Sequence, residues 1–338
     1  MSAKKTVKKP VKKVTTNKTK VSNHSVANVR HRKLTRKELK RRAAESLKKE
    51  QKTKHLPTSW SILTQSLRHL YAYNKTFLGI LLIYAFFYIL FVKGISANFQ
   101  LGTLRANLTS SFDHKISAFH TGIALYGLLL GSAGTSSSES SGVYQTVLLI
   151  IISLALIWAL RTSYGKVVKL AIRDAFYKST SSLVPFLAIV FIIVLQCLPA
   201  VFLGTIFSTI QSSHLTVNAF QQGVAIAILA AGFFWTFYML SSSLFALYIV
   251  TLPNAKPWEA LKAAKRLVRF RRVIVLRKVL FLPLILLIFA GVMLVPLILI
   301  YAKAAEIMFL VFTILVLGVI HGYLYTLYRY LINDTQND

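Results

Sequence analysis

Acidic residues are scarce in this sequence: 10 aspartates and glutamates stand against 41 lysines and arginines, which gives a net charge of +31. Acid–base catalysis, metal binding and cation-coupled transport usually rely on carboxylates. None of these carboxylates lies deep in an apolar run of the sequence. The scarcity argues against an ion-coupled transporter, although it leaves a facilitator open.

Cysteine is almost absent as well. The single one, Cys197, lies inside an apolar run, so the chain builds neither a disulfide framework nor a cysteine metal site. The sequence also lacks a phosphate-binding loop, a dinucleotide fingerprint, an HExxH pair and a nucleophile elbow. We therefore predict a protein that is not an enzyme and that holds no cofactor and no metal.

Apolar runs dominate what is present, since 55% of the residues are hydrophobic. Six runs come near the roughly 20 residues that a membrane-spanning helix needs. They are Phe77–Val92, Val143–Leu160, Leu183–Phe207, Gly223–Leu252, Val279–Ile300 and Ala305–Tyr328. The sequence thus predicts an all-α, polytopic membrane protein in which residues 56–338 form a transmembrane domain of about six helices.

Residues 1–55 differ sharply from this domain, because they are basic and contain few large apolar side chains. Such a segment buries too little surface to offset its ordering entropy, so we predict a disordered tail. A short helix is expected from Thr35, which has capping-box spacing to Glu38. The tail has three candidate partners: an anionic membrane surface, nucleic acid or another protein. It is not expected to be a signal peptide, because the first apolar run begins only near Phe77.

The distribution of basic residues predicts the orientation. With six spans, the basic segments Arg161–Lys178 and Lys256–Lys278 share one side with the tail and the C-terminus. The positive-inside rule then places both termini in the cytoplasm and the chain in the cell membrane. A seventh span at Ile116–Leu130 would move both basic segments outside. That segment is therefore expected to be a surface helix or a re-entrant helix on the outer side.

Three short amphipathic stretches each precede two apolar runs, which predicts a threefold repeat of an interfacial helix and a hairpin. The stretches are Trp60–Asn74, Tyr164–Lys178 and Asn254–Arg272. In the third, Pro257 suits a first helical turn. The expected apolar faces are Trp60, Leu63, Leu67 and Leu70 in the first, Val167, Leu170, Ala171 and Ala175 in the second, and Ala260, Leu261, Ala264, Leu267 and Val268 in the third.

We expect these apolar faces to lie among acyl chains while the cations of the helices bind anionic head groups. Each basic residue near such a surface contributes about 1 kcal/mol. The residues predicted to bind anionic lipid are Lys169, Arg173, Lys262, Lys265, Arg266, Arg269, Arg271, Arg272, Arg277 and Lys278.

Few polar residues interrupt the predicted spans. Gln196 and His321 are the intramembrane polar residues that we single out, and both are expected to form hydrogen bonds between helices. A functional role for His321 is the alternative. Small residues at Ser241–Ser243 are typical of close helix packing.

The segment from about Leu183 to Tyr330 resembles the six-helix membrane domain attached to some glycerophosphodiester phosphodiesterases, and related stand-alone bacterial membrane proteins. The residues that carry the resemblance lie in "LPNAKPWEALKAAKRLVRFRR", where a Pro-bearing turn leads into a helix with Trp258, Ala260, Leu261, Ala264, Leu267, Val268 and Arg269 at the motif positions. The catalytic domain of those enzymes has no counterpart in this sequence. The resemblance therefore implies the membrane fold and not the hydrolase activity.

These observations favour a membrane-organising or scaffold protein that engages anionic lipid through basic interfacial helices. Two alternatives remain open. One is a permease or facilitator for a lipid or small solute, with a cavity between hairpins. The other is a membrane tether for nucleic acid that uses the basic tail.

Overall fold

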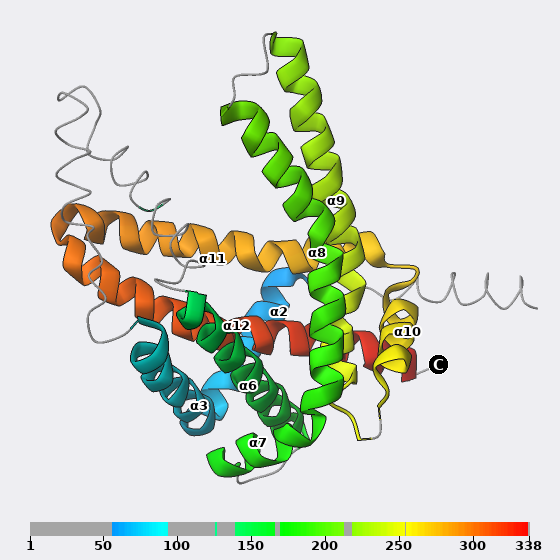
Figure 1. The fold of residues 1–338 in the computed structure, drawn as a ribbon. Helices are drawn as coiled ribbons and strands as arrows, with labels where there is room; N and C mark the ends of the chain where they lie inside the picture. Colours follow the sequence, from blue (N-terminus) through cyan, green and yellow to red (C-terminus); the bar gives the residue numbers. More distant parts are fainter. Residues whose placement is uncertain are drawn as a thin grey trace, which may run out of the picture. The chain divides into compact units, whose positions relative to one another are not determined.

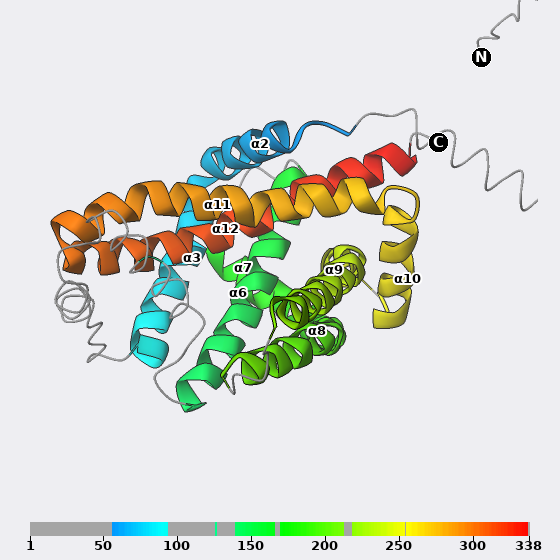
Figure 2. The same ribbon diagram turned by 90° about the horizontal axis from the view of Figure 1, so that it is seen from above.

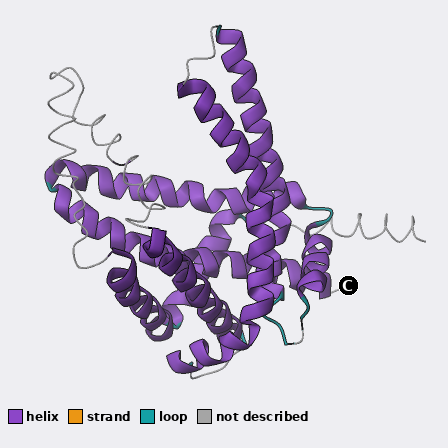
Figure 3. Cartoon of the chain, in the orientation of Figure 1, coloured by secondary structure: helices purple, strands orange, loops and turns teal. Residues whose placement is uncertain are grey.

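A computed structural model describes residues 56–93, 126, 139–165, 170–212, 218–253 and 255–336, all within the unit Lys48–Asp338. The predicted tail and Lys169 lie outside these ranges, as does 116–130 apart from Tyr126. Every regular element in the described ranges is helical, and none of them is a strand (Figure 3).

The helices follow the predicted runs closely. They are α2 (Ser59–Ala72), α3 (Asn74–Phe87), the π-helix η1 (Tyr88–Lys93), α6 (Glu139–Tyr164), α7 (Ile172–Ser179), the 3₁₀ turn η2 (Thr180–Ser182), α8 (Leu183–Ser212), α9 (Ala219–Ile249), α10 (Pro257–Val268), α11 (Arg272–Ile300) and α12 (Ala302–Gln336). Pro199 lies within α8, and Pro283 and Pro296 lie within α11. Membrane helices tolerate such prolines because neighbouring groups satisfy the freed backbone.

Six helical segments in the described ranges are long and apolar enough to cross a membrane. They are Asn74–Val92, Ser141–Tyr164, Ile172–Ile210, Phe220–Ile249, Arg272–Ile300 and Lys303–Asn333. This confirms the predicted all-α, polytopic fold. The chain is a multi-pass integral membrane protein.

The helices form three modules of one short helix and two spans. The first module is α2, α3–η1 and α6, the second is α7, α8 and α9, and the third is α10, α11 and α12. The two spans of each module pack against each other. Figures 1 and 2 show this pairing for α8 with α9 and for α11 with α12. The order of elements thus follows the predicted repeat.

Contacts between modules follow one rule. Each short helix packs on the second span of the preceding module: α7 on α6, α10 on α9, and α2 on α12. The first spans contact the same neighbours, since α8 contacts α6, α11 contacts α9 and α3 contacts α12. Because α2 and α3 reach α12 from the other end of the chain, the three modules close cyclically.

Helix α2 buries a different face from the predicted one. It begins after Thr58, whose side chain accepts a hydrogen bond from the Ser61 N–H (3.3 Å). Its buried residues are Ile62, Leu63 and Ser66, whereas Trp60 and Leu67 are exposed. The prediction grouped Trp60 and Leu67 with Leu63. It was wrong for these two because the face that meets α12 is centred on Ile62 and Ser66.

Tyr126, from the predicted outer segment, is buried against α11 and α12. Its hydroxyl donates to the Leu287 carbonyl (2.8 Å), and its ring is the nearest side chain to Gly291. Both contacts fall well inside the α11 span and not at its end. Tyr126 itself therefore packs against the middle of α11, and the rest of the predicted segment lies outside the described residues.

Candidate functional site: a basic helix face and a polar junction

The apolar face of α10 is covered by protein. Ala260, Leu261, Ala264 and Val268 are buried, and α10 packs chiefly on α9. The prediction that this face lies among acyl chains was therefore wrong for these residues. Two of the four are alanines, whose small side chains allow close approach of helix backbones. An amphipathic pattern alone does not distinguish a lipid partner from an apolar helix.

The opposite face of α10 carries exposed cations: Lys262, Lys265, Arg266 and Arg269. Lys265 and Arg266 lie in the last turn, where the helix dipole favours positive charge. Trp258 is 65% exposed, and the Lys262 ammonium lies 5.6 Å from its ring centroid. With the exposed Glu259 of the first turn, this side thus holds four cations, one carboxylate and an indole ring outward while the other face is fixed to α9.

The cations that follow α10 divide into two groups. Arg277 is exposed, and the Arg272 guanidinium lies 5.0 Å from the Tyr238 ring centroid. Arg271 and Lys278 are buried, with 8% and 5% of their surface exposed. Burial removes these two from the surface on which we predicted that they bind lipid.

Lys278 instead links α11 to the segment before α2 and to α12. Its ammonium donates to the Pro57 carbonyl, just before α2, and its own carbonyl accepts from the Tyr323 hydroxyl (2.9 Å). Lys278 shares a helical face with the buried residues Val275 and Leu282, three and four positions away. That spacing is the sequence signal for an inward-facing lysine, and our prediction did not use it.

The second basic segment is described only in part. Arg173 is exposed on α7, whereas the predicted Lys169 lies outside the described residues. Ala175 is buried as predicted, but Ala171 is exposed because it precedes the helix, which begins at Ile172. Lys178 forms an exposed ion pair with Asp174 (3.2 Å). Among the described cations of this segment, Arg173 is therefore exposed as predicted, and Lys178 is exposed within its ion pair.

His321 connects the second spans of all three modules. Its Nε2 lies 3.0 Å from the Ser153 hydroxyl of α6, and its Nδ1 lies 3.4 Å from the Tyr248 hydroxyl of α9. The imidazole is 8% exposed. This confirms the predicted hydrogen bonding of His321 between helices and places the residue at the centre of the cyclic arrangement.

Tyrosines surround this centre. The rings of Tyr248, Tyr325 and Tyr328 lie 5.8–5.9 Å from one another, and Tyr164 lies 5.5 Å from Tyr325. Tyr164 also bonds to the Thr326 hydroxyl (2.8 Å) and stacks on His69 of α2. We call His321, Tyr164, Tyr248, Tyr325 and Tyr328 the polar junction. It joins the carboxyl-terminal parts of α6, α9 and α12.

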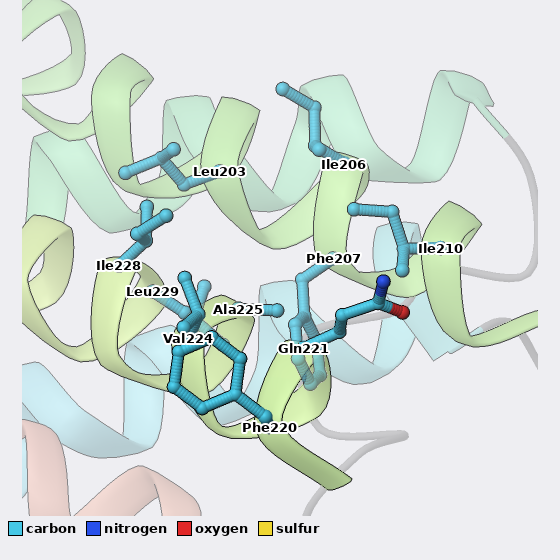
Figure 4. A pocket seen from close by; sticks show the side chains of 10 residues that line it. All are labelled: Leu203, Ile206, Phe207, Ile210, Phe220, Gln221, Val224, Ala225, Ile228 and Leu229. Atoms are coloured by element: carbon cyan, nitrogen blue, oxygen red, sulfur yellow. The ribbon is translucent and has the colours of Figure 1, made fainter. Parts of the chain in front are cut away.

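Gln196 does not form the hydrogen bond that we predicted between helices. Its side-chain oxygen is buried without a partner among the described residues, and the same holds for the Thr236 hydroxyl. Their helices α8 and α9 are the least buried spans, at 17% and 6% of their apolar windows. Farther along this hairpin lies an apolar cavity of about 330 Å³ whose lining includes Leu203, Phe207 and Phe220 (Figure 4). The cavity lies within one hairpin and not between hairpins.

The environment of His69 predicts a dependence of stability on pH. The ring is half-buried, stacks on Tyr164, contacts Tyr73 and bonds to the Ser163 hydroxyl (2.8 Å). Burial, and then the charge of Arg329, lower the pKa of His69 below its usual 6.5. The folded state therefore favours neutral His69, and its contribution to stability is present above about pH 6.5 and lost as pH falls toward the folded pKa.

We expect His69→Phe, which keeps the ring stack but cannot titrate, to lessen the fall in melting temperature between pH 7.5 and 5.5. Comparison with the unaltered protein separates the effect of His69 from that of the other titrating groups. Parallel curves of melting temperature against pH for the variant and the unaltered protein would contradict the prediction.

Comparison of the chain with protein-family models, with curated proteins and with solved structures found no match. The likeness to the membrane domain of glycerophosphodiester phosphodiesterases therefore stays a prediction. Among the described residues, no group of three histidines, cysteines or carboxylates is placed to hold a metal ion.

Proposed function

We propose that this multi-pass membrane protein is a non-enzymatic, membrane-organising scaffold that gathers anionic lipid around its basic helices. The observation that carries the proposal is the docking of α10: one face is buried on α9, and the other presents Lys262, Lys265, Arg266 and Arg269. A docked helix holds its charges in fixed positions, which lowers the entropy cost of binding head groups.

The placement of charge supports one basic side. The N-termini of α3, α8 and α11 and the C-termini of α6, α9 and α12 lie on the same side of a six-span arrangement. This side carries the exposed cations of α7, α10 and early α11, whereas the opposite helix ends carry Lys93 and Lys303 in the described ranges. By the positive-inside rule, the basic side is cytoplasmic, and so are both termini. The anionic leaflet of the cell membrane is then the surface that α10 meets.

Lipid quenching of Trp258 fluorescence tests the proposal. The other tryptophans, Trp60, Trp158 and Trp235, are replaced by phenylalanine, and the protein is placed in nanodiscs of mixed anionic and zwitterionic lipid. We expect brominated anionic lipid to quench Trp258 more strongly than brominated zwitterionic lipid at equal mole fraction. Replacing Lys262, Lys265, Arg266 and Arg269 by glutamine should abolish the preference for anionic lipid, because each positive charge contributes about 1 kcal/mol to the attraction.

Lys303→Gln is the control, because Lys303 is an exposed lysine at the opposite helix ends. This substitution should leave the preference for anionic lipid unchanged. High salt should weaken the preference in the unaltered protein. Equal quenching by both lipids in the unaltered protein would refute the lipid-gathering role.

A further inference from the structure

The seam between α8 and α9 is closed at mid-span and opens toward the C-terminal end of α8 and the N-terminal end of α9. Gly232, near the middle of the span Phe220–Ile249, lies against Leu203 so closely that a Cβ atom there would collide with the leucine side chain. Beyond this contact lies the apolar cavity, whose lining runs from Leu203 to Ile210 on α8 and from Leu229 to Phe220 on α9 (Figure 4). The cavity is therefore a slot with a closed inner end.

The slot covers the depth of one lipid leaflet. At 1.5 Å per residue, its lining extends roughly 10–14 Å along the helices, starting from Phe220 where the span begins. Half of the hydrocarbon core of a bilayer is about 15 Å thick. A volume of about 330 Å³ over this length gives a mean cross-section of roughly 25–30 Å², which admits one extended hydrocarbon chain but not a helix of about 10 Å diameter. These dimensions match one acyl chain that runs from the membrane surface to the bilayer middle.

The chemistry of the lining also suits a lipid chain. Its side chains are aliphatic or aromatic except for Gln221, which is exposed in the first turn of α9 at the membrane-surface end. Three lining residues, Ile206, Val224 and Ile228, are 41–55% exposed, so the slot is open to the surrounding lipid. A chain therefore enters sideways from the bilayer, with its polar end beside Gln221.

Formal charge is absent from this part of the chain. Residues 179–255 contain no lysine, arginine, aspartate or glutamate, so neither α8 nor α9 offers an ion-pair partner to a lipid head group. The cations of α10 follow the opposite end of α9. Binding in the slot therefore depends on the burial of hydrocarbon, which does not require a charged head group and is not weakened by the screening of charges.

We propose that the slot between α8 and α9 holds one acyl chain of a membrane phospholipid, taken from the leaflet opposite the basic helices. The bound chain fills space that the two helices leave open and gains dispersion contacts with both. The site is independent of the lipid-gathering role of α10, because it selects hydrocarbon whereas α10 attracts negative charge. Each of the two proposals therefore has its own measurement.

Photocrosslinking of the unaltered full chain in nanodiscs tests the site. The probe is phosphatidylcholine with a diazirine in the middle of one acyl chain, and peptide mass mapping locates the adducts. We expect Ala225 and Leu229, which line the slot and are half-buried, to be labelled several-fold more than Phe191 and Phe234, which are exposed outside it. The pattern should be the same with a phosphatidylglycerol probe and at high salt.

Ala225→Phe places a ring in the slot, whereas Ala227→Phe, at an exposed position outside the lining, is the matched control. The first substitution should lower the labelling of Leu229 roughly tenfold, the factor that about two buried methylene groups contribute to binding. The second should leave this labelling unchanged. If Ala225→Phe fails to fold, the adduct pattern of the unaltered protein decides alone.

Three results would overturn the proposal: labelling of the unaltered protein in proportion to exposure, equal effects of the two phenylalanine substitutions, or a requirement for an anionic head group. Replacing the α10 cations by glutamine should not change the labelling of the slot. That outcome separates the failure of this proposal from the failure of the lipid-gathering role.

Discussion

Aspartate in place of Ala264 is expected to detach α10 from α9, whereas aspartate in place of the adjacent Ala263 is expected to leave it docked. Ala264 is fully buried and Ala263 is exposed, so the two substitutions differ only in the face that receives the charge. Burial of Leu261 and Val268 contributes about 1.5–3 kcal/mol each to docking. A carboxylate placed between them loses its hydration without a partner, at a cost of several kcal/mol.

Cysteine labelling measures this detachment. Cys197 is first replaced by serine, and Leu261→Cys, at a position that is 6% exposed, then reports access to the buried face. We expect Ala264→Asp to raise the labelling rate at position 261 at least tenfold. Lys262→Cys should react rapidly in every variant because Lys262 is exposed. Slow labelling at 261 in Ala264→Asp would show that α10 does not depend on this contact.

Leucine in place of Gly322 is expected to separate α2 from α12. A Cβ atom at this position would lie 2.7 Å from the Ser66 hydroxyl and 2.9 Å from a Leu70 methyl, so even alanine is crowded there. Overpacking of this kind costs about 1–3 kcal/mol. Separation would also break the hydrogen bond between Tyr330 and Gln65 that joins the two helices.

The matched control is Gly204→Leu, because a Cβ atom at Gly204 of α8 meets nothing within 4 Å. Thermal unfolding in detergent should show a lower melting temperature for Gly322→Leu and an unchanged or higher one for Gly204→Leu. A cysteine at Ile62, which is fully buried, should become reactive only in the Gly322 variant. Equal melting temperatures for the two leucine variants would contradict the expected role of the α2–α12 contact.

The spans were predictable because each depends on a local property, the length of an apolar run. The same holds for α10, whose turn at Pro257 and alternation of cations and alanines are visible in the sequence. What covers the apolar face was not predictable, since acyl chains and the side of α9 are equally apolar. Our prediction that lipid covers this face was wrong because it considered α10 without the helix that packs against it.

The polar residues show a second limit of prediction from the sequence alone. His321 stood out within its apolar run, so its hydrogen bonding was predicted. Gln196 stood out equally, yet it has no partner in the described residues. The difference depends on what lies opposite: His321 meets Ser153 and Tyr248 from two other modules, and such non-local pairs leave no periodic signal. The gathering of Tyr164, Tyr248 and Tyr325 was missed for the same reason.

The contact of α2 with α12 has a consequence for biosynthesis. Helix α2 leaves the ribosome before either of the other modules, but its partner α12 is made after all the other described helices. Domains usually begin to fold from the N-terminus during synthesis. We therefore expect the Ile62 face of α2 to stay uncovered until α12 has been inserted, so premature termination before Ala302 would leave that face open to quality-control proteases.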